Sequence, residues 1–150
     1  MSAAFLIDTS VLVRRADPQS AQHAAATTAI PNLTASGVTL HVTPQNLIEF
    51  WAVATRPLAA NGLGKTTAEA LALVNGWKRV FVVLPDAPAV YDQWERLVSS
   101  YGVIGKSSHD ARLVAVMKVY GVTHLLTFNG GDFRRFETGE GISVIDPADA

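Results

Sequence analysis

Short apolar segments that alternate with helical patterns constrain this chain more than any other feature of its sequence. Four apolar runs and one alternating run predict strands at residues 4–7, 38–42, 80–84, 124–128 and 142–145. Start and stop signals between these runs predict helices at residues 20–36, 43–55, 66–78, 87–101 and 108–120. Short strands that are apolar throughout are typical of a parallel sheet covered on both faces. We therefore predict an α/β fold: a three-layer α/β/α domain with a central parallel sheet.

Several helix limits depend on individual residues. Thr43 followed by Pro44 predicts an N-cap and a first helical residue. Gly102 and Gly121 predict helix stops. Pro31 is expected to break or kink the first predicted helix, because proline removes a backbone donor from a helix interior.

Length and composition exclude several classes of protein. The 150 residues fit one domain spanning residues 1–150. The absence of cysteine excludes a disulfide scaffold, a cysteine-ligated zinc site and a thiol nucleophile. A net charge of −1 excludes nucleic-acid binding through overall charge. No apolar run approaches the ~18 residues of a membrane span and no signal-peptide pattern is present, so we expect a cytoplasmic protein without membrane contact.

The chain is rather apolar for a small monomer. Hydrophobic residues make up 49% of it and charged residues 17%, which excludes a disordered chain and points to a buried partner surface, as in a homodimer. Trp51, Trp77 and Trp94 fall on amphipathic helices. We interpret them as core or interface residues rather than as base-stacking residues.

Four carboxylates stand beside predicted strand ends or among apolar residues. Asp8 directly follows the first strand, and Asp132 follows a glycine pair just beyond the fourth strand. Glu49 lies between apolar neighbours in the second helix, and Asp110 lies near the start of the fifth. Because ligands of parallel α/β sheets lie beyond the carboxyl ends of the strands, these positions predict a common site.

Taken singly, two of these residues have ordinary structural explanations. Asp8 can cap the helix that follows it, although Ser10 can cap it equally well. Glu49 can belong to the solvated face of an amphipathic helix, which it shares with Gln45 and Arg56. Neither residue alone distinguishes a site from a structural role.

The other two have comparable explanations. Asp110 can complete a capping box with Ser107 and interact with the helix dipole. Asp132 can be a loop residue beside a tight turn, although Asn129 is the better turn residue.

The four carboxylates together favour a metal site. Several carboxylates a few ångströms apart cannot all be ionised without a cation. Hard divalent ions such as Mg²⁺ or Mn²⁺ take oxygen ligands of this kind. The histidines show no paired ligand spacing, so zinc is not expected: they are His23, His41, His109 and His124.

Four segments surround the carboxylates: Phe-Leu-Ile-Asp8-Thr-Ser-Val-Leu, Thr-Pro-Gln-Asn-Leu-Ile-Glu49-Phe, His-Asp110-Ala-Arg-Leu-Val-Ala and Leu-Leu-Thr-Phe-Asn-Gly-Gly-Asp132-Phe. In this order along the chain, the segments resemble the PIN-domain family of metal-dependent ribonucleases, most closely its VapC toxin branch. They span nearly the whole chain.

The resemblance implies a site and an activity. Asp8, Glu49, Asp110 and Asp132 would form an acidic Mg²⁺ or Mn²⁺ centre, with Asp8 and Asp110 as its core ligands. The polar groups expected to support that centre or contact RNA are Ser10, Thr127 and Asn129. The reaction implied is endonucleolytic hydrolysis of RNA phosphodiester bonds, which leaves a 5′-phosphate and a 3′-hydroxyl. A small antitoxin protein that covers the active site is the implied partner.

Basic residues near the carboxylates are candidate RNA contacts. The pair Arg134 and Arg135 is the most suggestive, and removing its charge should weaken RNA binding and flatten its salt dependence. An ordinary surface distribution of the 12 basic residues is the alternative. The other basic neighbours of the acids are Arg14, Arg15, Arg56, Lys106 and Arg112.

Other functions fit less well. A haloacid-dehalogenase phosphatase needs a second acid at Ser10, and a response-regulator receiver needs an acidic pair at the first strand. A dinucleotide-binding domain needs a glycine-rich turn where Asp8-Thr-Ser stands. Two alternatives stay open: a non-catalytic PIN-like module that binds RNA or protein, and a housekeeping RNA-processing nuclease.

Overall fold

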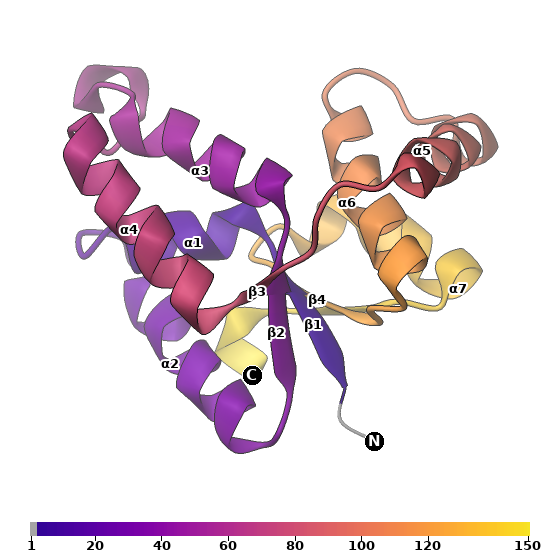
Figure 1. Cartoon of the computed structure of the whole chain (residues 1–150), viewed down its shortest axis with the longest axis horizontal. Helices are drawn as coiled ribbons and strands as arrows, with labels where there is room; N and C mark the ends of the chain where they lie inside the picture. Colours follow the sequence, from indigo (N-terminus) through magenta and orange to yellow (C-terminus); the bar gives the residue numbers. More distant parts are fainter. Residues whose placement is uncertain (1–2) are drawn as a thin grey trace.

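A computed structural model describes residues 3–150 and shows a five-stranded parallel sheet between two layers of helices (Figure 1). The strand order is β3-β2-β1-β4-β5, and all four neighbouring pairs are parallel. The strands are β1 (Ala4–Ile7), β2 (Thr39–Val42), β3 (Val82–Val83), β4 (His124–Leu126) and β5 (Ser143–Ile145). The predicted α/β/α class is confirmed.

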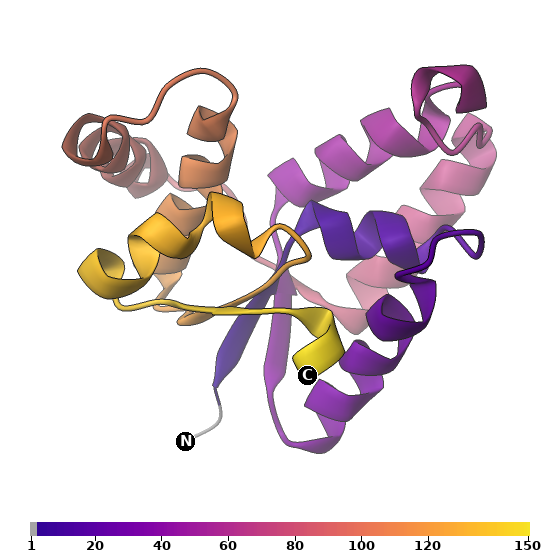
Figure 2. The ribbon, with the colours of Figure 1, turned by 180° about the vertical axis from the view of Figure 1, so that it is seen from behind.

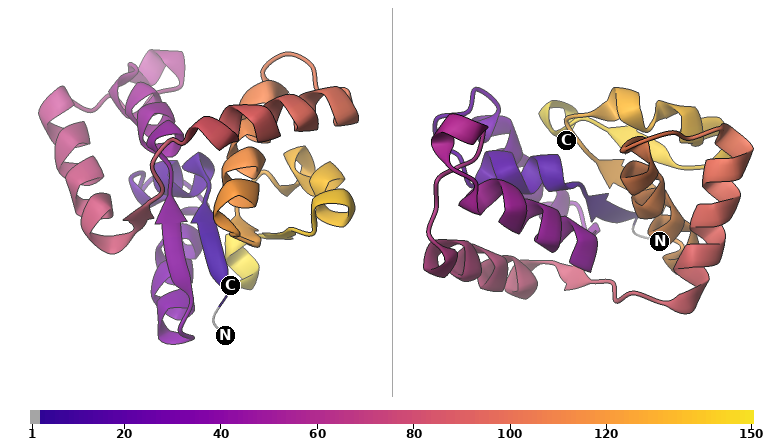
Figure 3. Two further views of the ribbon diagram at one scale, coloured as in Figure 1. Left: turned by 45° about the vertical axis from the view of Figure 1, so that its right-hand side comes forward. Right: turned by 90° about the horizontal axis from the view of Figure 1, so that it is seen from above.

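The helices divide between the two faces of the sheet (Figures 1 and 2). One face carries α1 (Thr9–Arg15), α2 (His23–Ala35), α3 (Pro44–Thr55) and α4 (Thr67–Val80). The other carries α5 (Pro88–Tyr101), α6 (Ser107–Tyr120) and α7 (Glu137–Glu140). Short 3₁₀ segments lie at Leu58–Ala60, Gly130–Asp132, Arg134–Phe136 and Pro147–Asp149. Viewed from above, the two helical groups leave the carboxyl end of β1 between them (Figure 3).

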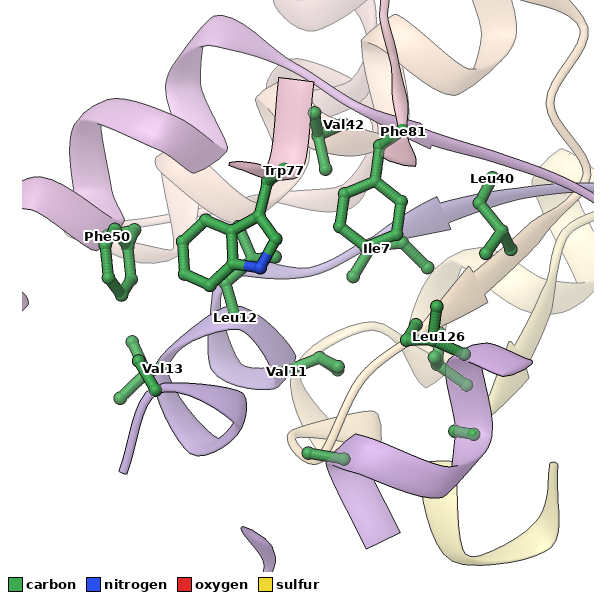
Figure 4. Packing of buried hydrophobic residues seen from close by; sticks show 14 of the residues in the cluster. Ile7, Val11, Leu12, Val13, Leu40, Val42, Phe50, Trp77, Phe81 and Leu126 are labelled. Carbon is green, nitrogen blue, oxygen red and sulfur yellow. The ribbon is translucent and has the colours of Figure 1, made fainter. Parts of the chain in front are cut away.

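Alternation along the strands builds a core on each side. Ile7 of β1 packs into the core beneath α1–α4, while its neighbour Leu6 packs into the core beneath α5 and α6. In the first core, Phe50 meets Trp77 edge to face with ring centroids 4.3 Å apart (Figure 4). Trp77 is buried, as the sequence predicted for a core residue.

The edge strand β3 differs from the prediction. The sequence predicted a buried strand at residues 80–84, but α4 continues through Val80 and only Val82 and Val83 pair with β2. Val80 and Val82 are 56% and 55% exposed. The apolar run at residues 80–84 therefore contributes an edge strand, β3, which among residues 3–150 pairs only with β2 and leaves its other side without a neighbouring strand.

Pro31 also behaves differently from the prediction. It lies inside α2 rather than ending it. Proline cannot donate to the carbonyl of Thr27, four residues earlier. The guanidinium of Arg15 donates to that carbonyl at 3.4 Å and to the carbonyl of Ala26 at 3.2 Å. A side chain from α1 thus supplies a donor near the one that the proline removes.

Most of the other predicted helix ends agree closely with the structure. Thr43 caps α3 through a reciprocal capping box with Asn46, and Pro44 is its first residue, as predicted. Gly102 and Gly121 end α5 and α6 with positive φ angles of 60° and 70°. The described residues contain no helix with the length and apolar character needed to cross a membrane.

Candidate active site

Asp8 lies at the point where the order of the strands reverses direction. It directly follows β1, between β2 and β4, which is where parallel α/β sheets bind ligands. Asp8 is the residue before α1 but makes no side-chain capping bond. Its Oδ2 accepts hydrogen bonds from Ser10 Oγ at 2.7 Å and Thr127 Oγ1 at 2.8 Å instead. Helix capping therefore does not account for this carboxylate, and Ser10 lies inside α1 rather than capping it.

The two hydroxyls also tie the loop after β4 to α1. The backbone N–H of Phe128 donates to Ser10 Oγ at 3.2 Å, and that of Asn129 donates to Thr127 Oγ1 at 2.9 Å. Ser10 and Thr127 are buried, at 6% and 1% exposure. Their hydrogen bonds to Oδ2 hold the Asp8 carboxylate in one orientation.

Glu49 reaches the same cleft from α3. Its Oε1 accepts from Thr9 Oγ1 at 2.9 Å, and its Oε2 accepts from Gln45 Nε2 at 3.2 Å. Asn46 in turn donates to Thr9 Oγ1 at 3.2 Å. The Gln45 bond is expected on a shared helix face, whereas the bond from Thr9 comes from another helix, α1, and turns Glu49 toward the cleft. Thr9 and Asn46 were not predicted, because their link to Glu49 joins positions distant in the chain.

Asp110 lies in the first turn of α6 without a capping role. Ser107 is already helical, Lys106 precedes the helix, and no side-chain capping bond forms. The predicted capping box is therefore absent, and that structural explanation of Asp110 is wrong. Its side chain lines the cleft with Glu49.

The charges of the cleft act on one another. Burial first, and then the negative charges of Asp8, Asp132 and Glu49, together raise the pKa of Asp110 to about 6, against a lowering by His109. Burial also raises the pKa of Asp8, against the hydrogen bonds from its two hydroxyl donors. The four predicted carboxylates therefore share one electrostatic environment.

Two adjoining hollows make up the cleft. The larger, of about 520 Å³, contains Asp8, Glu49, Asp110 and Asn129. The smaller, of about 330 Å³, contains Glu49, Asp110 and the exposed Asp132. Within residues 3–150 no three acidic or histidine side chains gather tightly enough to hold one metal ion as they stand. The structure brings the four carboxylates to one cleft without drawing them to one point.

Basic side chains border the same cleft. They come from α1, from the end of α3 and from the start of α6, as Arg14, Arg56 and Lys106. The predicted pair lies elsewhere: Arg134 is 3.6 Å from the Glu137 carboxylate, and Arg135 donates to the Tyr101 carbonyl at 3.4 Å. Neither arginine of the pair lines either hollow.

Comparison with known families identifies the fold. The family model described as PIN domain matches residues 5–138, so the chain belongs to the PIN domain family. This confirms the family resemblance carried by the four segments. No curated protein sequence matches the chain.

Solved structures agree with this assignment. A chain of Rickettsia felis VapBC2, bound to a DNA fragment from its promoter, has TM-score 0.68 and 13% identity, covering 95% of this chain and 98% of that one. Mycobacterium tuberculosis VapC20, a sarcin-ricin loop cleaving toxin, has TM-score 0.66 and 19% identity over 87% and 94%. Salmonella typhimurium VapBC, bound to DNA, has TM-score 0.66 and 20% identity over 98% and 99%. At these identities the likeness shows a shared fold.

Proposed function

We propose that this protein is a Mg²⁺- or Mn²⁺-dependent endoribonuclease and the toxin of a toxin–antitoxin pair. The observation that carries the proposal is that carboxylates from separate elements border one cleft at the strand-reversal point of a PIN fold, where burial and the charges of Asp8, Asp132 and Glu49 raise the pKa of Asp110. Like charges held together this way are stabilised by a divalent cation. Oxygen ligands of this kind suit Mg²⁺ and Mn²⁺.

The residues present fit such an ion in their donor chemistry. Asp8 is held by two buried hydroxyls and Asp110 lies in the first turn of α6, and these two would be the core ligands. Glu49 and the exposed Asp132 would complete the set, with Asn129 able to share the role of Asp132. Because no three acids gather tightly here, binding would draw side chains inward.

The chemistry divides between the ion and the chain. When bound, the ion would activate a water for in-line attack on phosphorus and stabilise the leaving oxygen. Ser10 and Thr127 hold the orientation of Asp8, and Gln45 and Thr9 hold that of Glu49. The products would be a 5′-phosphate and a 3′-hydroxyl.

RNA approaches this acidic site along a basic border. Arg14, Arg56 and Lys106 line the larger hollow and would contact phosphates on either side of the scissile bond. Because the chain has a net charge of −1, it can bind nucleic acid only through a local basic patch, and these three residues would supply one. With cellular RNA as the substrate, we expect the protein to act in the cytoplasm.

An apolar groove next to the cleft supports an antitoxin partner. It lies between α3 and α4, measures about 370 Å³ and contains Leu47, Ile48, Trp51, Leu71 and Val74. Ile48 and Leu71 are 69% and 49% exposed. Ile48 also lines a hollow that contains Glu49, so a peptide seated in the groove would reach the acidic cleft. A homodimer is a second expected assembly, based on the apolar composition.

Mapping of RNA ends tests the enzymatic proposal. Purified protein is incubated with total cellular RNA and Mg²⁺ or Mn²⁺, and new 5′ ends are sequenced. We expect discrete 5′-phosphate ends with the wild type, and none with Asp8→Asn or in the presence of a chelator. Identical end maps for wild type and Asp8→Asn would favour the alternative, a PIN module that binds RNA or protein without cleaving.

A further inference from the structure

A separate hollow of about 550 Å³ lies between α5 and α6, next to the acidic cleft. Its volume is within the range typical of small-molecule sites. Its apolar walls come from the start of α5 and include Pro88, Val90, Tyr91 and Trp94, and its polar groups come from His109, Arg112 and Asp86. The function proposed above uses none of these apolar residues.

Two aromatic rings form one wall of this hollow. Tyr91 and Trp94 are one turn apart on α5, with ring centroids 5.5 Å apart and an interplanar angle of 40°. Tyr91 is 60% exposed. The indole of Trp94 is held in place because its Nε1 donates to the Ser108 carbonyl of α6 at 2.8 Å. A large aromatic side chain left open beside a fixed indole offers a flat ring as a ligand surface.

A chain of hydrogen bonds connects Arg112, which also lines this hollow, to the acidic cleft. Arg112 donates to Asp86 Oδ1 at 2.9 Å and to Gln45 Oε1 at 3.0 Å. Gln45 donates in turn to Glu49 Oε2 at 3.2 Å. His109 lines both the aromatic hollow and the hollow that contains Asp110 and Asp132. The aromatic hollow therefore adjoins the acidic cleft, where a phosphodiester would be cut.

We propose that the hollow formed by Tyr91, Trp94 and Arg112 binds one unpaired nucleobase of the RNA, next to the scissile phosphate. This inference rests on the proposed nuclease function and names a subsite of it. Aromatic rings bind bases by stacking in a sequence-tolerant way, because every base has a flat π face. The guanidinium of Arg112, held by two acceptors, adds a planar cation at the mouth of the hollow. Trp94 packs against the second core, as the sequence predicted, and its half-buried side chain also forms part of the wall of the hollow.

Binding measurements without divalent metal separate this subsite from catalysis. The probes are a short single-stranded RNA of mixed sequence and an abasic chain of the same length, measured by fluorescence anisotropy in chelator. We expect wild type to bind the RNA more tightly than the abasic chain. Tyr91→Ala should weaken RNA binding about tenfold and leave abasic binding unchanged. Tyr91→Phe keeps the ring and should retain RNA binding, and the exposed Leu58→Ala on a distant 3₁₀ segment is the matched control.

The NMR signal of the Trp94 indole N–H tests whether a base binds in this hollow. The indole N–H signal of Trp94, assigned with Trp94→Phe, should shift on titration with nucleoside monophosphates and stay in place with ribose 5-phosphate. Equal affinity for RNA and abasic chain, or an unmoved Trp94 signal, would overturn the proposal.

Two further outcomes separate the proposals. A change of oligomeric state in Tyr91→Ala, seen by light scattering, would show instead that this face joins two copies of the chain. RNA binding that depends on the Tyr91 ring, in a protein that never cleaves RNA, would refute the nuclease and leave the base site standing.

Discussion

At the scale of single residues, the charge of the cleft works against the stability of the fold. Asp110 has its pKa raised from 3.8 to about 6, first by burial and then by the other three carboxylates. A carboxyl group whose folded pKa is above its unfolded pKa favours the folded state when protonated. Its stabilising contribution is complete below pH 3.8 and is lost as the pH rises through about 6.

Asp110→Asn should therefore stabilise the metal-free protein at neutral pH. In chelator we expect a higher Tm than wild type near pH 7.5, and a difference that disappears near pH 4, because wild-type Asp110 is then protonated. Mn²⁺ should raise the Tm of wild type more than that of the variant. Thermal unfolding followed by circular dichroism measures all three. Asp92→Asn, an exposed substitution on α5, is the control, and a variant Tm at or below wild type at pH 7.5 would contradict the interpretation.

Single residues also show how far the sequence could anticipate the site. Asp8, Asp110 and Asp132 could be selected because each stands near a strand end or a helix start, and Glu49 because it is a charged residue among apolar helical neighbours. Their partners were not all predictable: the hydroxyl of Thr9 meets Glu49 only because α1 and α3 pack together. The predicted RNA contacts Arg134 and Arg135 were chosen by closeness in sequence to Asp132, and their side chains pack toward Glu137 and Tyr101.

At the scale of elements, one buried carboxylate joins three helices of the second layer. Glu140 of α7 accepts from Arg96 at 2.7 and 3.2 Å and from Tyr101 Oη at 2.8 Å, both on α5. Lys118 of α6 donates to its backbone carbonyl at 2.9 Å. The bonds from Arg96 hold the pKa of Glu140 below its ordinary value. No part of this network could be predicted from the sequence, which gave no helix at residues 137–140.

Glu140→Gln should destabilise the fold while leaving the acidic cleft intact. We expect a loss of about 2 kcal/mol, since hydrogen bonds to a charged group typically contribute about 1.5–3 kcal/mol. A lowered pKa means that this contribution is present above the unfolded pKa and is lost as the pH falls through the folded pKa. Urea unfolding at pH 7 and at acid pH tests both points. Equal stability of variant and wild type at pH 7 would show that the network contributes nothing.

The predicted limits of helices and strands were wrong where tertiary contacts determine where an element ends. Caps such as Thr43-Pro44 are local, so the start of α3 was predicted to the residue. The limits of α4 and β3 depend on the edge position of β3, which no local pattern encodes. The continuation of α2 through Pro31 coincides with a donor from Arg15, which lies in another helix.

For the molecule as a whole, the proposed function has RNA binding to a protein whose net charge is −1. Binding then depends on where the few basic side chains lie. Arg56 and Lys106 line the cleft, and Arg134 and Arg135 do not. Salt dependence counts the phosphates that are neutralised, so it can distinguish these two pairs.

We expect the double substitution Arg56→Gln and Lys106→Gln to flatten the salt dependence of RNA binding. The slope of log K against log salt should fall by about 1 for each phosphate contact removed. The sequence alone predicted that removing the charges of Arg134 and Arg135 would flatten the salt dependence. The double substitution Arg134→Gln and Arg135→Gln is therefore the matched comparison. Fluorescence anisotropy at several salt concentrations gives both slopes. A larger change for the Arg134 and Arg135 pair would place the RNA outside the cleft.

The central claim is that carboxylates from separate elements form one metal-dependent catalytic centre. The most direct test is the single-turnover rate of RNA cleavage in Mn²⁺ for wild type, Asp8→Asn, Asp110→Asn and the double variant. Groups that act as a unit are strongly non-additive, so the double variant should lose no more activity than the worse single variant. Losses that multiply, or cleavage that survives in both single variants, would contradict the account.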